Sequence, residues 1–234
     1  MILNKMKLSI IIPTKNESFF LPQLLKSIIK QNINYSYEII ISDAKSEDKT
    51  LKIAKEYWCK ICNWWIPSIW RNNGAKIAKW KYLIFLDADS ILEKNSLNIW
   101  IDKILFSQKK ICTPYINLRN DENNFIAKIY YLFTIVWYRL GCVFWCCIII
   151  EKKLFQTIGG FNENIYLLED VELIKRARKF SERINTFPFC FTSSRRFKKI
   201  WTFKMIFYTT WLYILSIFWV YNEKNENNFN IYKL

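Results

Sequence analysis

Two aspartates separated by one alanine follow an apolar run near the middle of the 234-residue chain. Asp87 and Asp89 come directly after Tyr82–Leu86, in the stretch KYLIFLDADS. If the backbone continues as a strand, side chains two positions apart point the same way, so both carboxylates face one site. Neighbouring carboxylates repel each other unless a cation lies between or beside them. Mg²⁺ or Mn²⁺ commonly combines one or two carboxylates with substrate phosphates and water, so the pair predicts a divalent metal site.

A structural interpretation of the same acids stays open. The next residues, Ser90 to Glu93 (SILE), fit a capping box, in which a serine and a glutamate satisfy free amides at a helix start. Acids at such a position also interact favourably with the helix dipole. The metal interpretation is preferred because the acids follow an apolar run typical of a buried strand.

The chain contains no histidine. This excludes catalytic triads that use histidine, zinc sites with imidazole ligands and imidazole acid–base chemistry. Any general base must therefore be a carboxylate, Lys, Cys or Tyr.

The elements that position these acids follow an alternating pattern. Apolar runs at Leu8–Ile12, Glu38–Ser42 and Tyr82–Leu86 predict buried strands, the first of them stopped by Pro13. Leucines and isoleucines at helical spacing follow the first strand, and a second helix is predicted to open at Ser46 with acids in its first turn. Strands without polar alternation, separated by helices, predict an α/β fold with a mostly parallel sheet covered on both faces.

Ligands of parallel sheets bind at the carboxyl ends of the strands. Polar and acidic side chains follow all three predicted strands: Asn16 and Glu17, then Asp43, then Asp87 and Asp89. The sequence therefore predicts one binding site that these residues share. Farther along the chain, GGFNEN predicts a glycine turn, and a helix is expected from about Glu169.

The C-terminal part has a different composition. Met205–Tyr221 carries no charge and contains Trp211 and Trp219, with lysines just before it. As a helix it would reach about 25 Å, short of the ~30 Å hydrocarbon core, and its aromatic residues suit the membrane interface. We expect residues 201–222 to associate with a membrane, either spanning it or lying on it, and residues 223–234 to form a polar tail.

The formal charge of +15 favours an anionic partner such as a nucleotide or a membrane. No recognition motif or platform for single strands accompanies it, so nucleic acid is not expected. The seven cysteines and the lack of a secretory signal predict reduced thiols facing the cytosol, and the isolated pair Cys59 and Cys62 is read as idle thiols.

Four ordered stretches together resemble the motifs of family 2 glycosyltransferases: LSIIIPTKNE, EIIISDAKSEDKT, RNNGAKIAKWKYLIFLDADS and GGFNENIYLLEDVELIKRARK. The resemblance covers about Leu8 to Lys179. It implies the GT-A fold, a nucleotide-binding α/β domain here expected over residues 1–200, and an activated sugar donor. FTSSRRFKK and the apolar segment behind it also resemble a small single-domain bacterial subgroup.

The resemblance also implies roles for individual residues. Those expected to bind the donor are Pro13, Thr14, Asn16 and Glu17 in the nucleotide pocket, Asp43 at the base, Arg71 near the donor, Asp87 at the ribose or metal, and Arg195 and Arg196 at the diphosphate or an anionic acceptor. Asp89 is expected to bind the metal that bridges the diphosphate. Glu169 and Asp170 match the acidic pair that supplies the catalytic base.

Each role has a structural alternative that the sequence leaves open. Glu17 is also suited to capping the first helix, and Asp43 to a turn. Glu169 and Asp170 also suit the first turn of a helix, and the two arginines suit the flank of a membrane segment. The chain further departs from the family pattern where glycines are usual, at Ala44, Lys45 and Lys49.

These observations predict a metal-dependent, inverting glycosyltransferase that uses a UDP- or GDP-sugar. Its expected acceptor is a lipid-linked or cell-envelope glycan, and its expected place is the cytoplasmic side of the cell membrane, peripheral or C-terminally anchored. Two alternatives stay open: a sugar-nucleotide nucleotidyltransferase, and a catalytically silent membrane adaptor derived from a glycosyltransferase.

Overall fold

The computed structural model describes residues 7–63, 67–119, 147–165 and 169–193. The strands in this part are β1 (Lys7–Thr14), β2 (Ser36–Asp43), β3 (Lys60–Asn63), β4 (Tyr82–Leu86), β5 (Ile91–Leu92), β6 (Ile111–Leu118), β7 (Cys147–Glu151) and β8 (Arg183–Thr192). The helices are α1 (Leu21–Ile29), α2 (Thr50–Glu56), α3 (Pro67–Ile77), α4 (Ser96–Ser107), α6 (Lys152–Thr157) and α7 (Glu169–Ala177).

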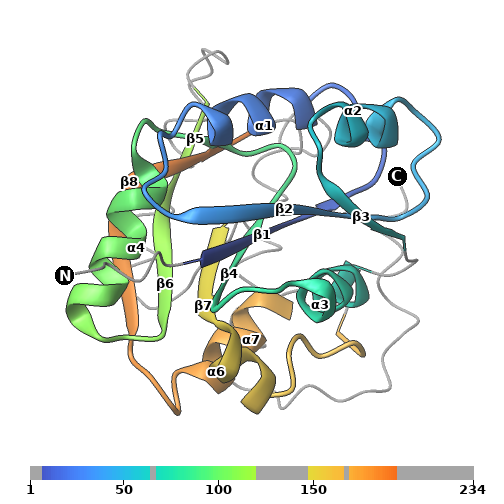
Figure 1. Ribbon diagram of the computed structural model, residues 1–234. Coiled ribbons are helices and arrows are strands. Elements are labelled where there is room, and N and C mark those ends of the chain that lie inside the picture. Colours follow the sequence, from blue (N-terminus) through green and yellow to red (C-terminus); the bar gives the residue numbers. More distant parts are fainter. Residues whose placement is uncertain (1–6, 64–66, 120–146, 166–168, 194–234) are drawn as a thin grey trace, which may run out of the picture. The chain divides into compact units, whose positions relative to one another are not determined.

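The strands form one sheet in the order β3-β2-β1-β4-β7-β6-β8-β5 (Figure 1). The first four neighbours are parallel, as the sequence predicts. The register pairs Thr14 with Asp43, so β1 and β2 end at the same edge of the sheet. The ends of these strands and of β4 thus lie together, as expected for a shared site.

The other half of the sheet is mixed, but six of the eight described strands still run in one direction, so the expected mostly parallel sheet is present. β7 runs antiparallel to both β4 and β6, β6 and β8 are parallel, and β5 is antiparallel to β8. The sequence pattern beyond Asn95 carries no clear strand–helix alternation, so it gave no signal for this change of direction.

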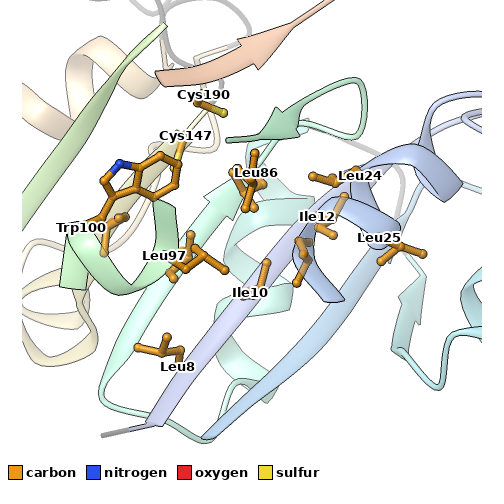
Figure 2. Close-up of a cluster of buried hydrophobic side chains, with 14 of the residues drawn as sticks. Leu8, Ile10, Ile12, Leu24, Leu25, Leu86, Leu97, Trp100, Cys147 and Cys190 are labelled. Atoms are coloured by element: carbon orange, nitrogen blue, oxygen red, sulfur yellow. The ribbon is translucent and has the colours of Figure 1, made fainter. Parts of the chain in front are cut away.

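Two apolar clusters lie on the two faces of the sheet. Leu8, Ile10 and Ile12 of β1 face one cluster, which α1, α2 and α4 cover and which contains Trp100 (Figure 2). Ile11 faces the other cluster, covered by α3, α6 and α7. Burial on both faces explains why apolar and polar residues do not alternate along β1, in which Ser9 is the one polar residue between Leu8 and Ile12.

Helix α3 packs especially closely on the sheet. A Cβ added at Gly74 would lie 2.4 Å from Cγ2 of Ile11, so only glycine allows this approach without a shift. The close packing fixes the start of α3, including Arg71, relative to β1.

Three local expectations are wrong. Strand β1 continues through Pro13 to Thr14, because its pairing with β4 ends at Ile11 and a missing N–H beyond that point breaks no bond with β4. Helix α2 begins at Thr50 rather than Ser46, and no acid lies in its first turn. The capping-box alternative also fails, because Ile91–Leu92 form β5 and the next helix begins at Ser96.

The predicted membrane segment, residues 201–222, and the polar tail lie outside the described residues. Among those the structure does describe, no helix is both long and apolar enough to cross a membrane.

Candidate active site

The predicted site residues gather at the edge where β1, β2 and β4 end. Thr14 closes β1, Asp43 closes β2, and Asp87 follows β4 directly. Helix α7 begins at Glu169, as predicted, and brings its first-turn acids to the same region. The site therefore has two parts, one formed by acidic side chains and one formed by two neighbouring loops.

The acidic part is organised by one arginine, and we call Arg71, Asp87, Glu169 and Asp170 the acid centre. From α3, Arg71 donates through Nη2 to Oδ1 of Asp87 at 3.0 Å and through Nη1 to Oε1 of Glu169 at 2.6 Å. The side chain of Arg71 is only 15% exposed, and its two partners are 22% and 14% exposed. One guanidinium therefore joins α3, the end of β4 and the start of α7.

Asp170 is the acid whose protonation the surroundings change most. Burial and the neighbouring charge of Glu169 raise the pKa of Asp170 to about 8, against the opposing effects of Arg71 and the Val171 amide. That amide donates to Oδ1 of Asp170 at 2.7 Å. A carboxylate with a pKa near neutrality suits a general base, because it both accepts and releases a proton at working pH.

Asp87 and Asp89 do not lie on a strand. The prediction that they face one site because they are two strand positions apart is therefore wrong. Strand β4 ends at Leu86, and the amide of Ser90 donates to the carbonyl of Asp87 at 3.0 Å in a turn. Asp87 is partly exposed and faces Arg71, whereas Asp89 is buried.

The donor set of these two acids still suits the predicted metal. Both residues offer only carboxylate oxygens, the ligands that Mg²⁺ and Mn²⁺ prefer. Within the described residues, no three His, Cys, Asp or Glu side chains are grouped for a metal. A metal held by Asp87 and Asp89 would thus depend on a phosphate-bearing ligand and water for its remaining positions.

Asp43 lies at the centre of the neighbouring loop region. Its side chain is fully buried and accepts hydrogen bonds from Thr14 Oγ1 at 2.8 Å, Ser46 N at 2.7 Å and Ser46 Oγ at 2.6 Å. The structural alternative for Asp43, a turn residue, is therefore present in the structure. A carboxylate offers about four lone-pair sites, so these contacts leave room for one more donor.

Side chains of the β2–α2 loop (residues 44–49) and of Thr50 bind three successive amides of the β1–α1 loop (residues 15–20). Asn16 N donates to Ser46 Oγ at 2.8 Å, Glu17 N to Thr50 Oγ1 at 2.8 Å, and Ser18 N to Asp48 Oδ2 at 3.0 Å. In return, Glu47 N donates to Asn16 Oδ1 at 2.9 Å. We call these four contacts the loop clasp.

Sequence reasoning missed Ser46, Asp48 and Thr50 as members of the site. Their signal was present: Ser, Asp and Thr are the residues that bond to nearby backbone amides, and KSEDKT holds all three. Burial alone would raise the pKa of Asp48, but hydrogen bonds from Thr50 and Ser18 lower it to about 2. The Asp48 carboxylate therefore stays charged at neutral pH.

The glycine turn is tied to the acid centre through α3. Asn72, next to Arg71, accepts from Phe161 N and donates to Phe161 O, both at 2.8 Å. Arg176 of α7 donates to the carbonyl of Gly160 at 2.7 Å and pairs with Glu172. A pocket of about 410 Å³ opens here, lined by Asn72, Gly159, Gly160, Phe161, Asn162, Glu163, Glu172 and Arg176.

The structure brings together Arg71, Asp87, Glu169 and Asp170, and separately Thr14, Asn16, Glu17 and Asp43. Glu17 does not cap α1, because that helix begins after Phe20 with no side-chain cap. Glu169 and Asp170 do lie in the first turn of α7, so their structural alternative coexists with a place in the acid centre. Arg195 and Arg196 lie outside the described residues.

A family model described as "Glycosyl transferase family 2" matches residues 9–159, more than half of the chain. The chain belongs to glycosyl transferase family 2. A curated relative, the poly(ribitol-phosphate) beta-glucosyltransferase of Bacillus spizizenii, is 34% identical over 105 residues. The match covers 41% of this chain and 17% of the relative, so the chain spans a small part of that protein.

Solved structures show the same GT-A fold. S. aureus TarS 1–349 in complex with UDP-GlcNAc is 21% identical, with a TM-score of 0.66 over 81% of this chain and 59% of that one. A Pyrobaculum calidifontis mannosyltransferase in complex with GDP-Man and Mn²⁺ is 15% identical, with a TM-score of 0.62 over 79% of this chain and 56% of that one. The predicted family and the GT-A-like fold are thereby confirmed, whereas the C-terminal membrane-associating helix stays a prediction.

Proposed function

We propose that this protein transfers a sugar from a UDP- or GDP-sugar to a hydroxyl of a lipid-linked or cell-envelope acceptor, with a divalent metal. The observation that carries the proposal is the acid centre. Its base candidate, Asp170, and the predicted metal ligand Asp87 lie around one arginine at the carboxyl edge of the sheet. The loop region with Thr14 and Asp43 lies at the same edge.

The site residues divide the work of the transfer. Thr14, Asn16, Glu17 and Asp43 border the nucleotide, and Asp43 has acceptor capacity for one donor of the base. Asp170 takes the proton of the acceptor hydroxyl as it attacks. Asp87 and Asp89 would hold Mg²⁺ or Mn²⁺, which neutralises the leaving diphosphate. Direct attack on the sugar carbon in one step gives inversion, the stereochemistry that the family resemblance implies.

The loop clasp argues against the nucleotidyltransferase alternative. Loops that hold phosphates through their backbone need free amides after the first strand. Here the amides of Asn16, Glu17 and Ser18 all donate to the other loop. Charge on the diphosphate would therefore be balanced by a metal and by arginine instead.

The proposal also covers the acceptor of the sugar and the place of the protein in the cell. The relatives named above include an enzyme of poly(ribitol-phosphate), which supports a cell-envelope acceptor. The apolar segment at residues 201–222 and the basic Arg195 and Arg196 before it support a place on the cytoplasmic face of the membrane.

Calorimetric titration of the detergent-solubilised protein with UDP, GDP and their sugars, with and without Mn²⁺, tests the proposal. We expect one nucleotide to bind, and to bind more tightly with Mn²⁺. Asp89→Ala should remove the effect of the metal while the melting temperature stays within a few degrees. Binding that is equal in wild type and Asp89→Ala would contradict the metal site, and no binding by a folded wild type would favour the silent adaptor.

A further inference from the structure

Two contacts of the loop clasp continue into relays of the same design. In each, a hydroxyl accepts from an amide of the β1–α1 loop and donates to an acid. Ser46 Oγ links Asn16 N to Asp43, and Thr50 Oγ1 links Glu17 N to Asp48. The acid of the first relay, Asp43, is predicted to bind the nucleotide base, whereas the sequence predicts no role for the acid of the second relay, Asp48.

Asp48 holds the second relay through both of its carboxylate oxygens. Its Oδ2 accepts from Ser18 N at 3.0 Å, and its Oδ1 accepts from Thr50 N at 2.9 Å and from the Thr50 hydroxyl. Thr50 is fully buried, so its hydroxyl is held in one place. Hydrogen bonds to an ionised acceptor are stronger than neutral ones.

The β2–α2 loop contains one residue with an unfavourable backbone conformation. Lys45 adopts a left-handed conformation (φ 55°), which is strained for a residue with a side chain. Contacts from elsewhere must therefore hold the loop in this shape.

We propose that Asp48 is a positioning residue for the donor nucleotide: it holds the β1–α1 loop against the β2–α2 loop so that the nucleotide pocket is formed before the nucleotide arrives. The inference rests on the proposed function, since it concerns the pocket of that same site. Asp48 acts through the loops and does not touch the donor. Its loss lowers affinity because the nucleotide must then order both loops as it binds.

Two measurements on the full chain test this role. Hydrogen–deuterium exchange reports the amides of Asn16, Glu17 and Ser18 directly, and calorimetry with the nucleotide that the wild type binds reports affinity. Asp48→Ala should speed exchange of these amides and weaken nucleotide binding about tenfold. Asp48→Asn, which keeps one acceptor oxygen, should lie in between. The control Glu56→Ala, which removes an exposed acid from the same helix region, should change neither.

The steady-state constants provide a second readout. In Asp48→Ala the KM for the donor should rise about tenfold while kcat stays near the wild-type value, because the acid centre is untouched. Should Asp48→Ala fail to fold, Asp48→Asn carries the same comparison.

The outcomes separate the two proposals. Unchanged affinity in a variant whose loop amides exchange faster would overturn the positioning role, because the clasp would then serve only the fold. Unchanged exchange in Asp48→Ala would overturn it as well. Failure of the proposed function is visible in the wild type alone, as an absence of nucleotide binding, and it would remove the ligand that Asp48 is said to position.

Discussion

The two halves of the candidate site are built from different interactions. The loop clasp uses hydrogen bonds between hydroxyls, amides and one acid, and it joins two loops of adjacent βα units. The acid centre uses ion pairs around Arg71 and joins residues as far apart as Arg71 and Glu169. The clasp joins two consecutive βα units and contains one charged side chain, whereas the centre joins residues much farther apart in the sequence and consists of charged side chains.

The two halves are expected to tolerate different conditions. Asp48 titrates far below neutral pH, so the clasp keeps its contacts from acidic to alkaline solution. The acid centre contains a group with a pKa near 8, so its charge changes within the working range. We therefore expect nucleotide binding to vary little with pH and the transfer step to vary strongly.

The largest expected effect on stability comes from removing the arginine that joins the acid centre. Arg71→Met leaves Asp87 and Glu169 partly buried without their cation, and such a loss costs about 3 kcal/mol of stability. Urea unfolding measures this cost, and the transfer rate should fall at least about a hundredfold as the acids separate. Arg178→Met, at an exposed position past the end of α7, is the control and should change little.

A normal stability of Arg71→Met would contradict the view that Arg71 holds the two acids together. Loss of stability with normal transfer would instead separate the structural role of Arg71 from the chemistry. The first result would mean that the ion pairs of Arg71 contribute little to folding. The second would mean that the acid centre stabilises the fold without serving the transfer step.

The second effect is the pH dependence of transfer. A general base works deprotonated, and the pKa of Asp170 is raised to about 8, so kcat/KM should rise about tenfold per pH unit below 8 and level off above it. The folded state also holds an extra proton between the unfolded pKa near 4 and 8, so stability should decrease as pH rises through this range.

Asp170→Asn is the matched variant for both parts of this prediction. It should lower transfer by about three orders of magnitude, abolish the pH step in stability and leave nucleotide binding intact. A wild-type profile that is flat between pH 6 and 9 would exclude Asp170 as the base.

The smallest effect concerns the left-handed lysine in the clasp. Lys45→Gly should raise the free energy of unfolding by roughly 0.5 to 1 kcal/mol, since glycine adopts φ 55° without a steric penalty. Lys49→Gly is the control, because Lys49 has φ −75° and gains nothing from glycine. Thermal unfolding of the two variants should therefore shift in opposite directions, and equal shifts would contradict the strain assigned to Lys45.

The sequence predicted those parts of the molecule that depend on local pattern. Strands β1, β2 and β4 and their shared edge followed from apolar runs ending in polar residues such as Asp43 and Asp87. The start of α7 at Glu169 and the glycine turn before it were also predicted correctly.

The parts that failed depend on tertiary contacts. Pairing of Arg71 with Glu169, 98 positions away, leaves no periodic signal in the sequence. Helix α2 begins at Thr50 and not at Ser46, because Ser46 instead donates to Asp43 and accepts from the amide of Asn16. The antiparallel β7 was missed because an apolar strand carries no mark of its direction.

The reversal of direction at β7 has a consequence for how this domain can change. Strand β6 runs toward the candidate-site edge and ends at Leu118, and β7 starts at that edge, where Cys147 pairs with Leu86. The chain therefore leaves the sheet and re-enters it beside the site, and the strand pairings of the described residues include none of the sequence between these two points. Such a connection is a natural point for grafting, because a replacement sequence would begin and end beside the site while β1, β2 and β4 keep their pairing.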